Sequence, residues 1–297
     1  MDRSGDPTEH LPNSYVSRRS TEAQALSAWT PPTGTLGELT DEAHARAATL
    51  SGSAAELEAR ARRARPVPSF RNALKGERVA VVAEIKRSSP SKGPINPGLD
   101  LPRQVTAYEA GGAAAISILT EPTRFGGSND DLVRARELVM IPLLKKDFHV
   151  DRTQIFEART LGASAALVIA RAVSPARLEE LMGAGADVGL EILVEVRDER
   201  ELDLALSLNS TLIGVNNRNL ETLEIDPETS VRLLPLIPRN VVAIAESGVK
   251  SAADVERLAD AGADAVLVGS ELSRSRDPEA AVRSLTGTRR TRGARKS

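Results

Sequence analysis

Apolar residues follow two different periodicities along the chain, and the change between them falls near Phe70. From Leu36 to Leu50 apolar positions recur every three or four residues, which predicts an amphipathic helix. A second helix is predicted over Ala54 to Arg65, because Pro66 ends the helical pattern. Beyond Phe70 short aliphatic runs alternate with segments of helical period, which indicates a series of strand–helix units.

Eight aliphatic runs have the length expected of buried strands. They are Val79–Ile85, Ala114–Leu119, Ile141–Lys145, Ala166–Ala170, Leu190–Val196, Thr211–Val215, Val241–Ala245 and Ala265–Val268. Helices are predicted near residues 101–111, 130–139, 151–161, 174–184, 198–207, 226–235, 251–261 and 278–285. Strand–helix repetition of this kind predicts a parallel sheet whose strands are covered on both faces. The span of about 250 residues is the usual size of a closed (β/α)8 barrel.

An internal sequence repeat supports this fold. Segments beginning at Glu109, Arg159 and Ala259 share one design, in which a helix ends at glycine and a buried strand follows. A doubly wound open sheet is the alternative, but no Gly-x-Gly-x-x-Gly follows the first predicted strand. We therefore expect an α/β protein with a single (β/α)8 TIM barrel and an N-terminal helical extension, together spanning residues 36–286.

Both ends of the chain differ from this pattern. Residues 1–35 are polar and lack a sustained apolar period, which predicts a flexible extension. The alternative is a docking arm that uses Tyr15 and Trp29. Residues 287–297 are rich in arginine and are predicted to form a basic disordered tail, with a specific anion-binding patch as the alternative.

Composition narrows the possible partners and chemistry. The 297 residues include 39 Lys+Arg and 41 Asp+Glu, a formal charge of −2, so neither nucleic acid nor an anionic membrane is an expected partner. The chain has no cysteine, which excludes a disulfide framework, a thiolate nucleophile and a Cys-ligated metal. The N-terminal segment lacks a signal-like apolar stretch, and no apolar run approaches the roughly 18 residues of a membrane helix. We therefore expect a soluble cytoplasmic protein.

Polar residues collect at the carboxyl ends of the predicted strands, which is where a (β/α)8 barrel places its chemistry. Six strands end in this way, at Glu84–Lys86, Lys145–Asp147, Glu195, Asn216–Arg218, Glu246–Gly248 and Gly269–Ser270. Alternation along a strand puts Glu84 and Lys86 on one face, where partial desolvation would shift their pKa values and suit acid–base work. The same alternation points Lys145 and Lys146 to opposite faces and leaves open which of them faces inward.

Glycine and serine follow the seventh and eighth predicted strands. Ser247 and Gly248 stand after one, and Gly269 and Ser270 after the other. Exposed backbone amides in these two positions predict a phosphate site, with ordinary tight turns as the alternative. The breaker-rich loop of residues 87–98 is either a lid or a flexible connection. The histidines at positions 10, 44 and 149 lack metal-ligand spacing, so no metal site is predicted.

Seven motifs occur in order along the strands. They read Ala83-Glu-Ile-Lys-Arg-Ser-Ser-Pro-Ser-Lys-Gly, Leu119-Thr-Glu-Pro-Thr-Arg-Phe-Gly-Gly-Ser, Leu144-Lys-Lys-Asp-Phe, Leu193-Val-Glu-Val, Ile213-Gly-Val-Asn-Asn-Arg-Asn-Leu-Glu-Thr, Ala245-Glu-Ser-Gly-Val and Leu267-Val-Gly-Ser. From about Leu36 to about Leu285 the chain strongly resembles the indole-3-glycerol-phosphate synthase family. The segments before and after that span have no counterpart in the family pattern.

The resemblance implies a reaction and its catalytic residues. The reaction would close the indole ring of 1-(2-carboxyphenylamino)-1-deoxyribulose 5-phosphate with loss of carbon dioxide and water, without an organic cofactor or a metal. Lys146 matches the family's general acid, and the resemblance thereby selects it over Lys145. Glu195 matches a carboxylate that assists proton transfers, and Glu84 and Lys86 match a catalytic pair on the first strand. The division of the dehydration roles among Lys86, Glu84 and Glu195 stays open.

The resemblance also implies the binding residues. Substrate-binding positions are Ser89, Asn216, Arg218 and Glu246, and phosphate-binding positions are Ser247, Gly248, Gly269 and Ser270. Arg218 is the natural partner for a carboxylate. The expected partner is a phosphorylated small molecule, and the expected assembly is a monomer or a weak homo-oligomer.

Two other functions compete with this one. Phosphoribosylanthranilate isomerase is a related phosphosugar barrel, but it typically uses a cysteine, which this chain lacks. A non-catalytic phosphosugar-binding or scaffold protein would keep the pocket without its chemistry, although all the matched charged residues are present.

Overall fold

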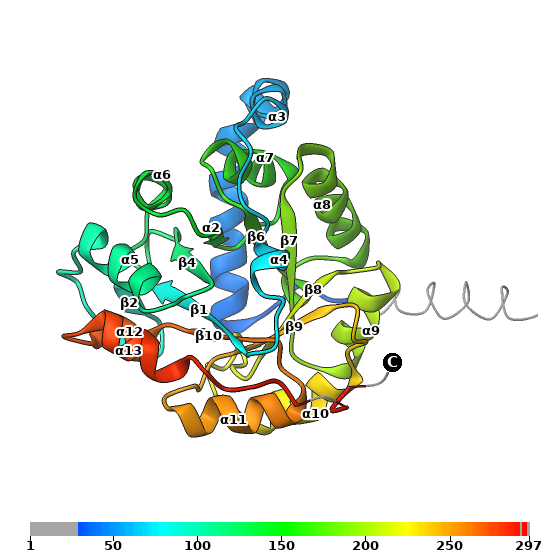
Figure 1. Cartoon of the computed structure of the whole chain (residues 1–297). Helices are drawn as coiled ribbons and strands as arrows, with labels where there is room; N and C mark the ends of the chain where they lie inside the picture. The colour runs from blue at the N-terminus through cyan, green and yellow to red at the C-terminus, as the bar shows by residue number, and fades with distance from the viewer. Residues whose placement is uncertain (1–28, 292, 296–297) are drawn as a thin grey trace, which may run out of the picture.

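The computed structural model describes residues 29–291 and 293–295, which form a closed barrel of eight parallel strands (Figure 1). The strands are β1 (Ala80–Ile85), β4 (Ala115–Leu119), β5 (Leu143–Lys146), β6 (Ala165–Ile169), β7 (Glu191–Val196), β8 (Leu212–Asn216), β9 (Val242–Glu246) and β10 (Ala265–Val268). Each strand pairs with the next, and Ala83 of β1 pairs with both Ile116 of β4 and Val268 of β10, which closes the ring. The predicted (β/α)8 barrel and its eight strands are confirmed.

Helices connect the strands and surround the barrel (Figure 1). They are α5 (Leu101–Ala110), α6 (Asn129–Leu138), α7 (Arg152–Thr160), the short 3-10 helix η2 (Ala170–Ala172), α8 (Pro175–Val188), α9 (Glu199–Ser207), α10 (Glu228–Leu233) with η3 (Leu234–Leu236), α11 (Ala252–Ala261), α12 (Ser270–Arg274) and α13 (Pro278–Leu285). All the helices expected between the strands are present. The short α12 directly after β10 was not predicted, because five residues are too few for a helical period to show.

Local capping residues set where the helices begin. Asp151 accepts a hydrogen bond from Thr153 N while the Gln154 side chain accepts from Asp151 N, which makes a capping box at the start of α7. Ser174 caps α8 and is followed by Pro175 in the first turn, where a proline costs no hydrogen bond. These caps fix the length of the loops that follow the strands, and those loops form the mouth of the barrel.

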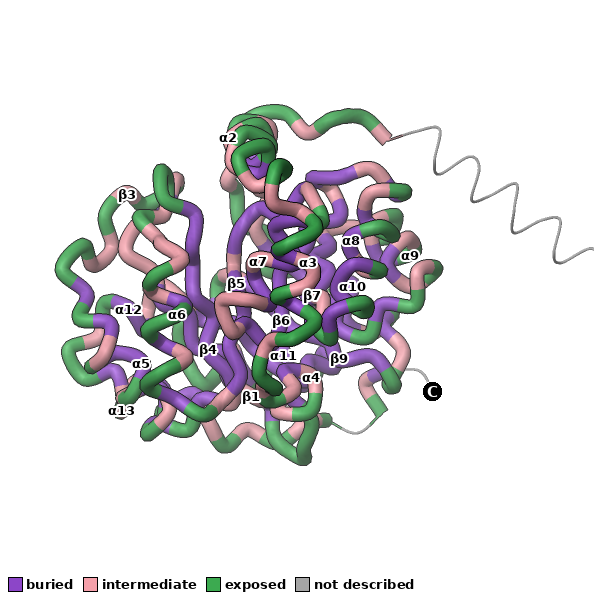
Figure 2. Tube along the Cα trace, turned by 90° about the horizontal axis from the view of Figure 1, so that it is seen from above, coloured by how far each residue is buried: buried purple, intermediate pink, exposed green. Residues whose placement is uncertain are grey.

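The barrel core is aliphatic except at one end. All five residues of β6 are buried, and in Figure 2 buried strands occupy the middle of the molecule while exposed turns form its rim. At the carboxyl ends the buried residues become polar, and they include Glu84, Glu195, Asn216 and Glu246. Buried charges need partners, so this end of the barrel must hold a network of interactions.

The N-terminal helices pack against the barrel. They are α2 (Gly34–Leu50), η1 (Ser51–Ser53), α3 (Ala54–Arg62) and α4 (Phe70–Ala73). As the periodicity predicts, α2 buries Leu36, Leu39, Ala43 and Ala47. The helix begins two residues before the predicted start, because Thr33 adopts an extended conformation at its N-cap. Arg46 of α2 donates a 2.6 Å hydrogen bond to Asp147, the residue directly after β5.

The loop after β1 is anchored at both of its ends. It contains a small hairpin of β2 (Ser88–Ser89) and β3 (Gly93–Pro94) that the sequence did not predict. Arg87 Nη2 donates to Asp131 at 3.0 Å, and Asn96 Nδ2 donates to the Ser273 carbonyl at 2.8 Å. That the loop of residues 87–98 acts as a lid stays a prediction.

The structure bears differently on the predictions for the two ends of the chain. Most of the predicted N-terminal extension, with Tyr15, lies outside the described residues, while Trp29 is half-buried. The sequence predicts a disordered tail, and its described residues, 287–291 and 293–295, contact the barrel. Thr288 pairs with Val79 at the start of β1, and Arg295 Nη2 lies 2.6 Å from Asp264 Oδ2. The physical reason is that Asp264 lies just before β10 with only 5% exposure, and the tail arginines supply its counter-charge.

Within the described residues, no helix has both the length and the apolar character that crossing a bilayer requires.

Candidate active site

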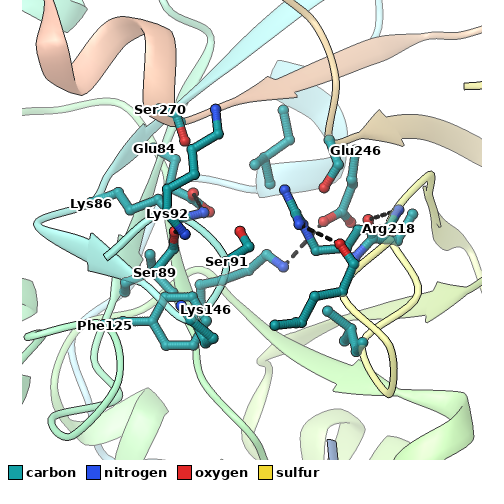
Figure 3. A pocket seen from close by; sticks show the side chains of 18 of the residues that line it. Glu84, Lys86, Ser89, Ser91, Lys92, Phe125, Lys146, Arg218, Glu246 and Ser270 are labelled. Carbon is teal, nitrogen blue, oxygen red and sulfur yellow. Dashed lines mark hydrogen bonds and ion pairs between the residues drawn. The ribbon is translucent and has the colours of Figure 1, made fainter. Parts of the chain in front are cut away.

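A cavity of about 140 Å³ lies at the carboxyl ends of the strands (Figure 3). All the predicted site residues except Glu195 line it: Glu84, Lys86, Ser89, Lys146, Asn216, Arg218, Glu246, Ser247, Gly248, Gly269 and Ser270. Glu195 does not line the cavity, but its carboxylate accepts a hydrogen bond from Lys146, which does. The structure therefore brings together residues that are as much as 186 positions apart in the sequence (84 to 270).

Lys146 lies at the centre of this site. Its Nζ is 3.0 Å from Glu195 Oε2 and 3.1 Å from Glu246 Oε2, and Figure 3 shows the side chain extending toward Glu246. The neighbouring Lys145 points the other way, with a 2% exposed side chain that pairs with Glu157 of α7 at 3.4 Å. The strand thus places Lys146, and not Lys145, at the cavity.

Electrostatics in this cluster hold protons on both partners. Burial alone would lower the pKa of Lys146, but the carboxylates of Glu195, Glu246 and Glu84 outweigh it and raise that pKa above its usual range. Burial raises the pKa of Glu246 to about 8, Lys146 opposes this shift, and Glu195 adds to it. Since one ammonium faces two buried carboxyl groups, the cluster can keep a proton on Glu246 near neutral pH. A charged ammonium therefore lies beside a carboxyl group that gives up its proton less readily than an ordinary glutamate.

A second acid–base pair lies on β1. Lys86 Nζ is 3.1 Å from Glu84 Oε1, as the alternation along the strand predicts. Lys86 Nζ also lies 5.6 Å from the centroid of the Phe125 ring, which is a cation–π distance. The Phe125 and Phe148 rings are 6.3 Å apart and both line the cavity. This side of the site offers an aromatic wall, with its two rings tilted by 38°, next to the Glu84–Lys86 ion pair.

Asn216 and Arg218 hold the end of β8 to the central cluster. Asn216 Nδ2 donates to Glu195 Oε1 at 2.9 Å, and Asn216 Oδ1 accepts from Arg218 N at 2.9 Å. Arg218 Nη1 donates to the Leu223 carbonyl at 2.7 Å, while burial lowers the pKa of its guanidinium. A partly desolvated guanidinium at a cavity wall binds a carboxylate strongly.

The loops after β9 and β10 carry the residues that were predicted to bind phosphate. Ser247 has φ of 66° and Gly248 has φ of 94°, so two successive residues adopt left-handed backbone conformations. A serine in this region is strained, and such strain concentrates at functional sites. Gly269 and Ser270 face the same cavity, together with Lys92 and Lys250.

Sequence reasoning assigned no site role to several positions that line or shape the cavity. Lys92 stands in the first motif and in the loop of residues 87–98, and Lys250 follows Gly248 by two residues, but neither was assigned to the site because both stand in loops, away from the strand ends. Gly214 was also missed: a Cβ there would lie 2.1 Å from Glu246 Oε1, just as one on Gly269 would lie 2.3 Å from Glu84 Oε1. These glycines leave space for the two carboxyl groups. The available signal for Gly214 was a lone glycine inside an aliphatic strand, which marks a close approach.

Among residues 29–291 and 293–295, no three His, Asp or Glu side chains are grouped so that they could hold a metal ion. The site as described consists of ammonium, carboxyl, guanidinium, hydroxyl and amide groups around an apolar wall.

Known proteins resemble this chain in sequence and in fold. A sequence model of the family described as indole-3-glycerol phosphate synthase matches residues 39–285. The chain is 48% identical over 233 residues to an indole-3-glycerol phosphate synthase of Mycolicibacterium gilvum, covering 78% of this chain and 86% of that protein. It is 48% identical over 230 residues to indole-3-glycerol phosphate synthase 1 of Streptomyces coelicolor, covering 77% and 86%. A solved 3-hexulose-6-phosphate synthase from Salmonella typhimurium shares the fold, with a TM-score of 0.56, 15% identity, and coverage of 70% and 96%.

Proposed function

The chain belongs to the indole-3-glycerol phosphate synthase family, and from this premise we propose how its cavity performs that reaction. The enzyme closes the indole ring of 1-(2-carboxyphenylamino)-1-deoxyribulose 5-phosphate in tryptophan biosynthesis, and releases carbon dioxide and water. The proposal concerns the roles of Lys146, Glu195, Glu84 and Lys86.

Ring closure needs a proton on the ketone of the sugar chain. The aromatic carbon that carries the carboxylate attacks the ketone carbon, and Lys146 gives a proton to the ketone oxygen as the new carbon–carbon bond forms. An ammonium near a developing alkoxide stabilises this transition state. The carboxylate then leaves as carbon dioxide, and its bonding electrons restore the aromatic ring.

Dehydration needs an acid and a base. The new hydroxyl leaves as water when a second proton reaches its oxygen, and one proton leaves the methylene carbon next to nitrogen. We assign these steps to Glu195 and to the Glu84–Lys86 pair. Support comes from the 3.0 Å and 3.1 Å ion pairs in which these carboxylates take part, because such pairs can exchange a proton without large movement.

We assign the two anionic ends of the substrate, its phosphate and its carboxylate, to different groups of residues. We assign the phosphate to Ser247, Gly248, Gly269 and Ser270, with Lys92 and Lys250 beside them. We assign the substrate carboxylate to Arg218, and the sugar chain to Ser89, Asn216 and Glu246. The aromatic ring would pack on the wall that contains Phe125.

One observation carries this proposal: Lys146 lies within ion-pair distance of both Glu195 and Glu246 at a cavity wall. Its test is a turnover assay with the purified enzyme, which follows indole fluorescence and release of carbon dioxide. Lys146→Ala should remove most turnover and leave substrate binding measurable. Near-normal kcat in this variant would refute the role of Lys146.

Cofactor use, assembly and location complete the proposal. The groups that face the cavity supply the acid, base and anion-binding functions that the reaction needs, so we propose that turnover needs neither metal nor organic cofactor. Activity lost with a chelator would contradict this. We also propose a cytoplasmic enzyme that is a monomer or a weak homo-oligomer, which light scattering over a range of concentrations would test.

A further inference from the structure

A second cavity of about 100 Å³ lies next to the active site and shares Asn216 and Arg218 with it. Glu195 lines this second cavity, although its Oε2 pairs with Lys146 of the first. Glu195 therefore stands between the two cavities. Glu201 of α9 also lines the second cavity, and its Oε2 accepts a 2.7 Å hydrogen bond from Arg197 N.

The overall reaction consumes a proton from solvent. The substrate carries an ionised carboxylate, and this carboxylate leaves as neutral carbon dioxide. Two protons enter to turn the ketone oxygen into water, and one is recovered when the methylene carbon becomes an aromatic C–H carbon. Substrate carboxylate plus one proton thus gives product, carbon dioxide and water. The acid that starts the reaction must therefore be reprotonated from solvent once in every turnover.

We propose that Glu201 relays this proton from water in the second cavity to Glu195, which passes it to Lys146. The proposal rests on the proposed function, in which Lys146 is the proton donor. Glu201 touches no reacting atom in this scheme and acts through Glu195. By this route Lys146 can be reprotonated without a proton passing through the space that the substrate fills.

The charges around Glu201 suit a relay. Burial raises its pKa to about 7, with further raising by Asp198 and Glu195, while the hydrogen bond from Arg197 N and the charge of Arg171 lower it. These groups belong to the α9 N-terminus, to β7 and to η2. Arg218 and Glu221, on the loop after β8, line the same cavity. A carboxyl that titrates near neutral pH both accepts and releases protons efficiently.

The second cavity has room for water and a route to solvent. Its volume of about 100 Å³ exceeds the share of about 30 Å³ that one water molecule takes in the liquid. Arg171 and Glu221 form part of its wall and keep 27% and 24% of their side chains exposed. Its polar lining offers hydrogen-bond partners to water from several elements.

Glu201→Gln tests the relay in the full-length enzyme. Gln keeps an acceptor for Arg197 N but cannot carry the proton. We expect the first turnover to keep its rate, because Lys146 starts protonated, and later turnovers to slow by roughly tenfold. Product should therefore appear as a burst of about one equivalent per enzyme, with kcat/KM unchanged and a larger solvent deuterium effect on kcat. Glu199→Gln is the matched control on the same helix, since Glu199 is exposed and pairs with Arg232.

Glu201→Ala gives an independent readout, because the space left by the side chain opens onto the second cavity. Formate should restore its kcat in a concentration-dependent manner and should not restore Lys146→Ala. Wild-type kcat without a burst in Glu201→Gln, or a deficit in Glu201→Ala that formate leaves unchanged, would overturn the relay. Neither result touches the proposed function, which fails instead if Lys146→Ala keeps its turnover.

Discussion

Lys146→Met is the substitution that tests the central cluster most directly. It keeps much of the side-chain volume and removes the charge that pairs with Glu195 at 3.0 Å and Glu246 at 3.1 Å. Breaking a buried ion pair by removing one partner costs about 3 to 5 kcal/mol, because the other charge stays buried without compensation. For a chain of this size that corresponds to a fall in Tm of about 10 °C. Loss of the general acid should lower kcat by about 10² to 10⁴.

The loss of stability in Lys146→Met should depend on pH in a definite direction. Glu246 has a folded-state pKa of about 8, raised above that of an unfolded glutamate even with Lys146 present. A carboxyl with a raised folded pKa keeps its full contribution to stability below its unfolded pKa, and loses it as pH rises through the folded pKa. Between those values Glu246 is protonated in the folded state, so the part of the penalty that comes from Glu246 should be small at pH 6 and large at pH 9, while the part that comes from Glu195 is present at both pH values.

Urea unfolding at pH 6 and pH 9 measures this difference, and a fluorescence assay of indole formation measures kcat. Lys146→Met combined with Glu246→Gln is the matched control: the second change removes one of the two buried carboxyl groups, so stability at pH 9 should return in part while turnover stays low. The reasoning is refuted if Lys146→Met unfolds at the same urea concentration as wild type at pH 9, or if its kcat stays within tenfold of wild type.

Three further substitutions test other parts of the structure. Gly214→Ala places a Cβ where Glu246 Oε1 now lies, at 2.1 Å, so the carboxyl group must move and we expect kcat to fall at least tenfold, measured by turnover. Arg218→Lys keeps the charge but loses the planar fork that binds a carboxylate, so KM should rise about tenfold, and an unchanged KM would reject Arg218 as the carboxylate partner. Arg295→Ala removes a buried partner of Asp264, so stability should fall by about 1 to 3 kcal/mol in urea unfolding with kcat unchanged.

The sequence predicted the barrel well because the fold depends on signals that are local. Aliphatic runs such as Ala265–Val268 and caps such as Asp151 act within a few residues, so strand and helix boundaries fall close to the predicted ones. The contacts of the tail were not predicted, for the opposite reason. Arg295 is ordered by Asp264, 31 positions earlier, and nothing in the composition of a basic segment reveals a distant buried carboxylate.

The site was predictable as a set of strand ends, but its geometry was not. The alternation of side chains along a strand predicted that Glu84 and Lys86 lie on one face. It could not distinguish Lys145 from Lys146, because alternation alone does not show which face of the strand lies inside the barrel. The resemblance to a known family selected Lys146, and the structure agrees, since Lys145 pairs with Glu157 on the helical side. The second cavity behind Glu195 had no sequence signal, because it depends on residues from separate loops.

Under the proposed function, the arrangement of charge would keep the acid and the anion sites from interfering with each other. Lys146 is enclosed by Glu195 and Glu246, so its ammonium is already neutralised and is a poor partner for a phosphate dianion. Arg218 makes its hydrogen bond to a neutral carbonyl, and so its charge stays available to an anion. A substrate with an anion at each end is then oriented by the uncompensated cations, while the compensated lysine is left to transfer its proton. The carboxylates that raise the pKa of Lys146 would therefore do two things in the proposed function: they keep the ammonium charged, and they keep it from binding the wrong end of the substrate.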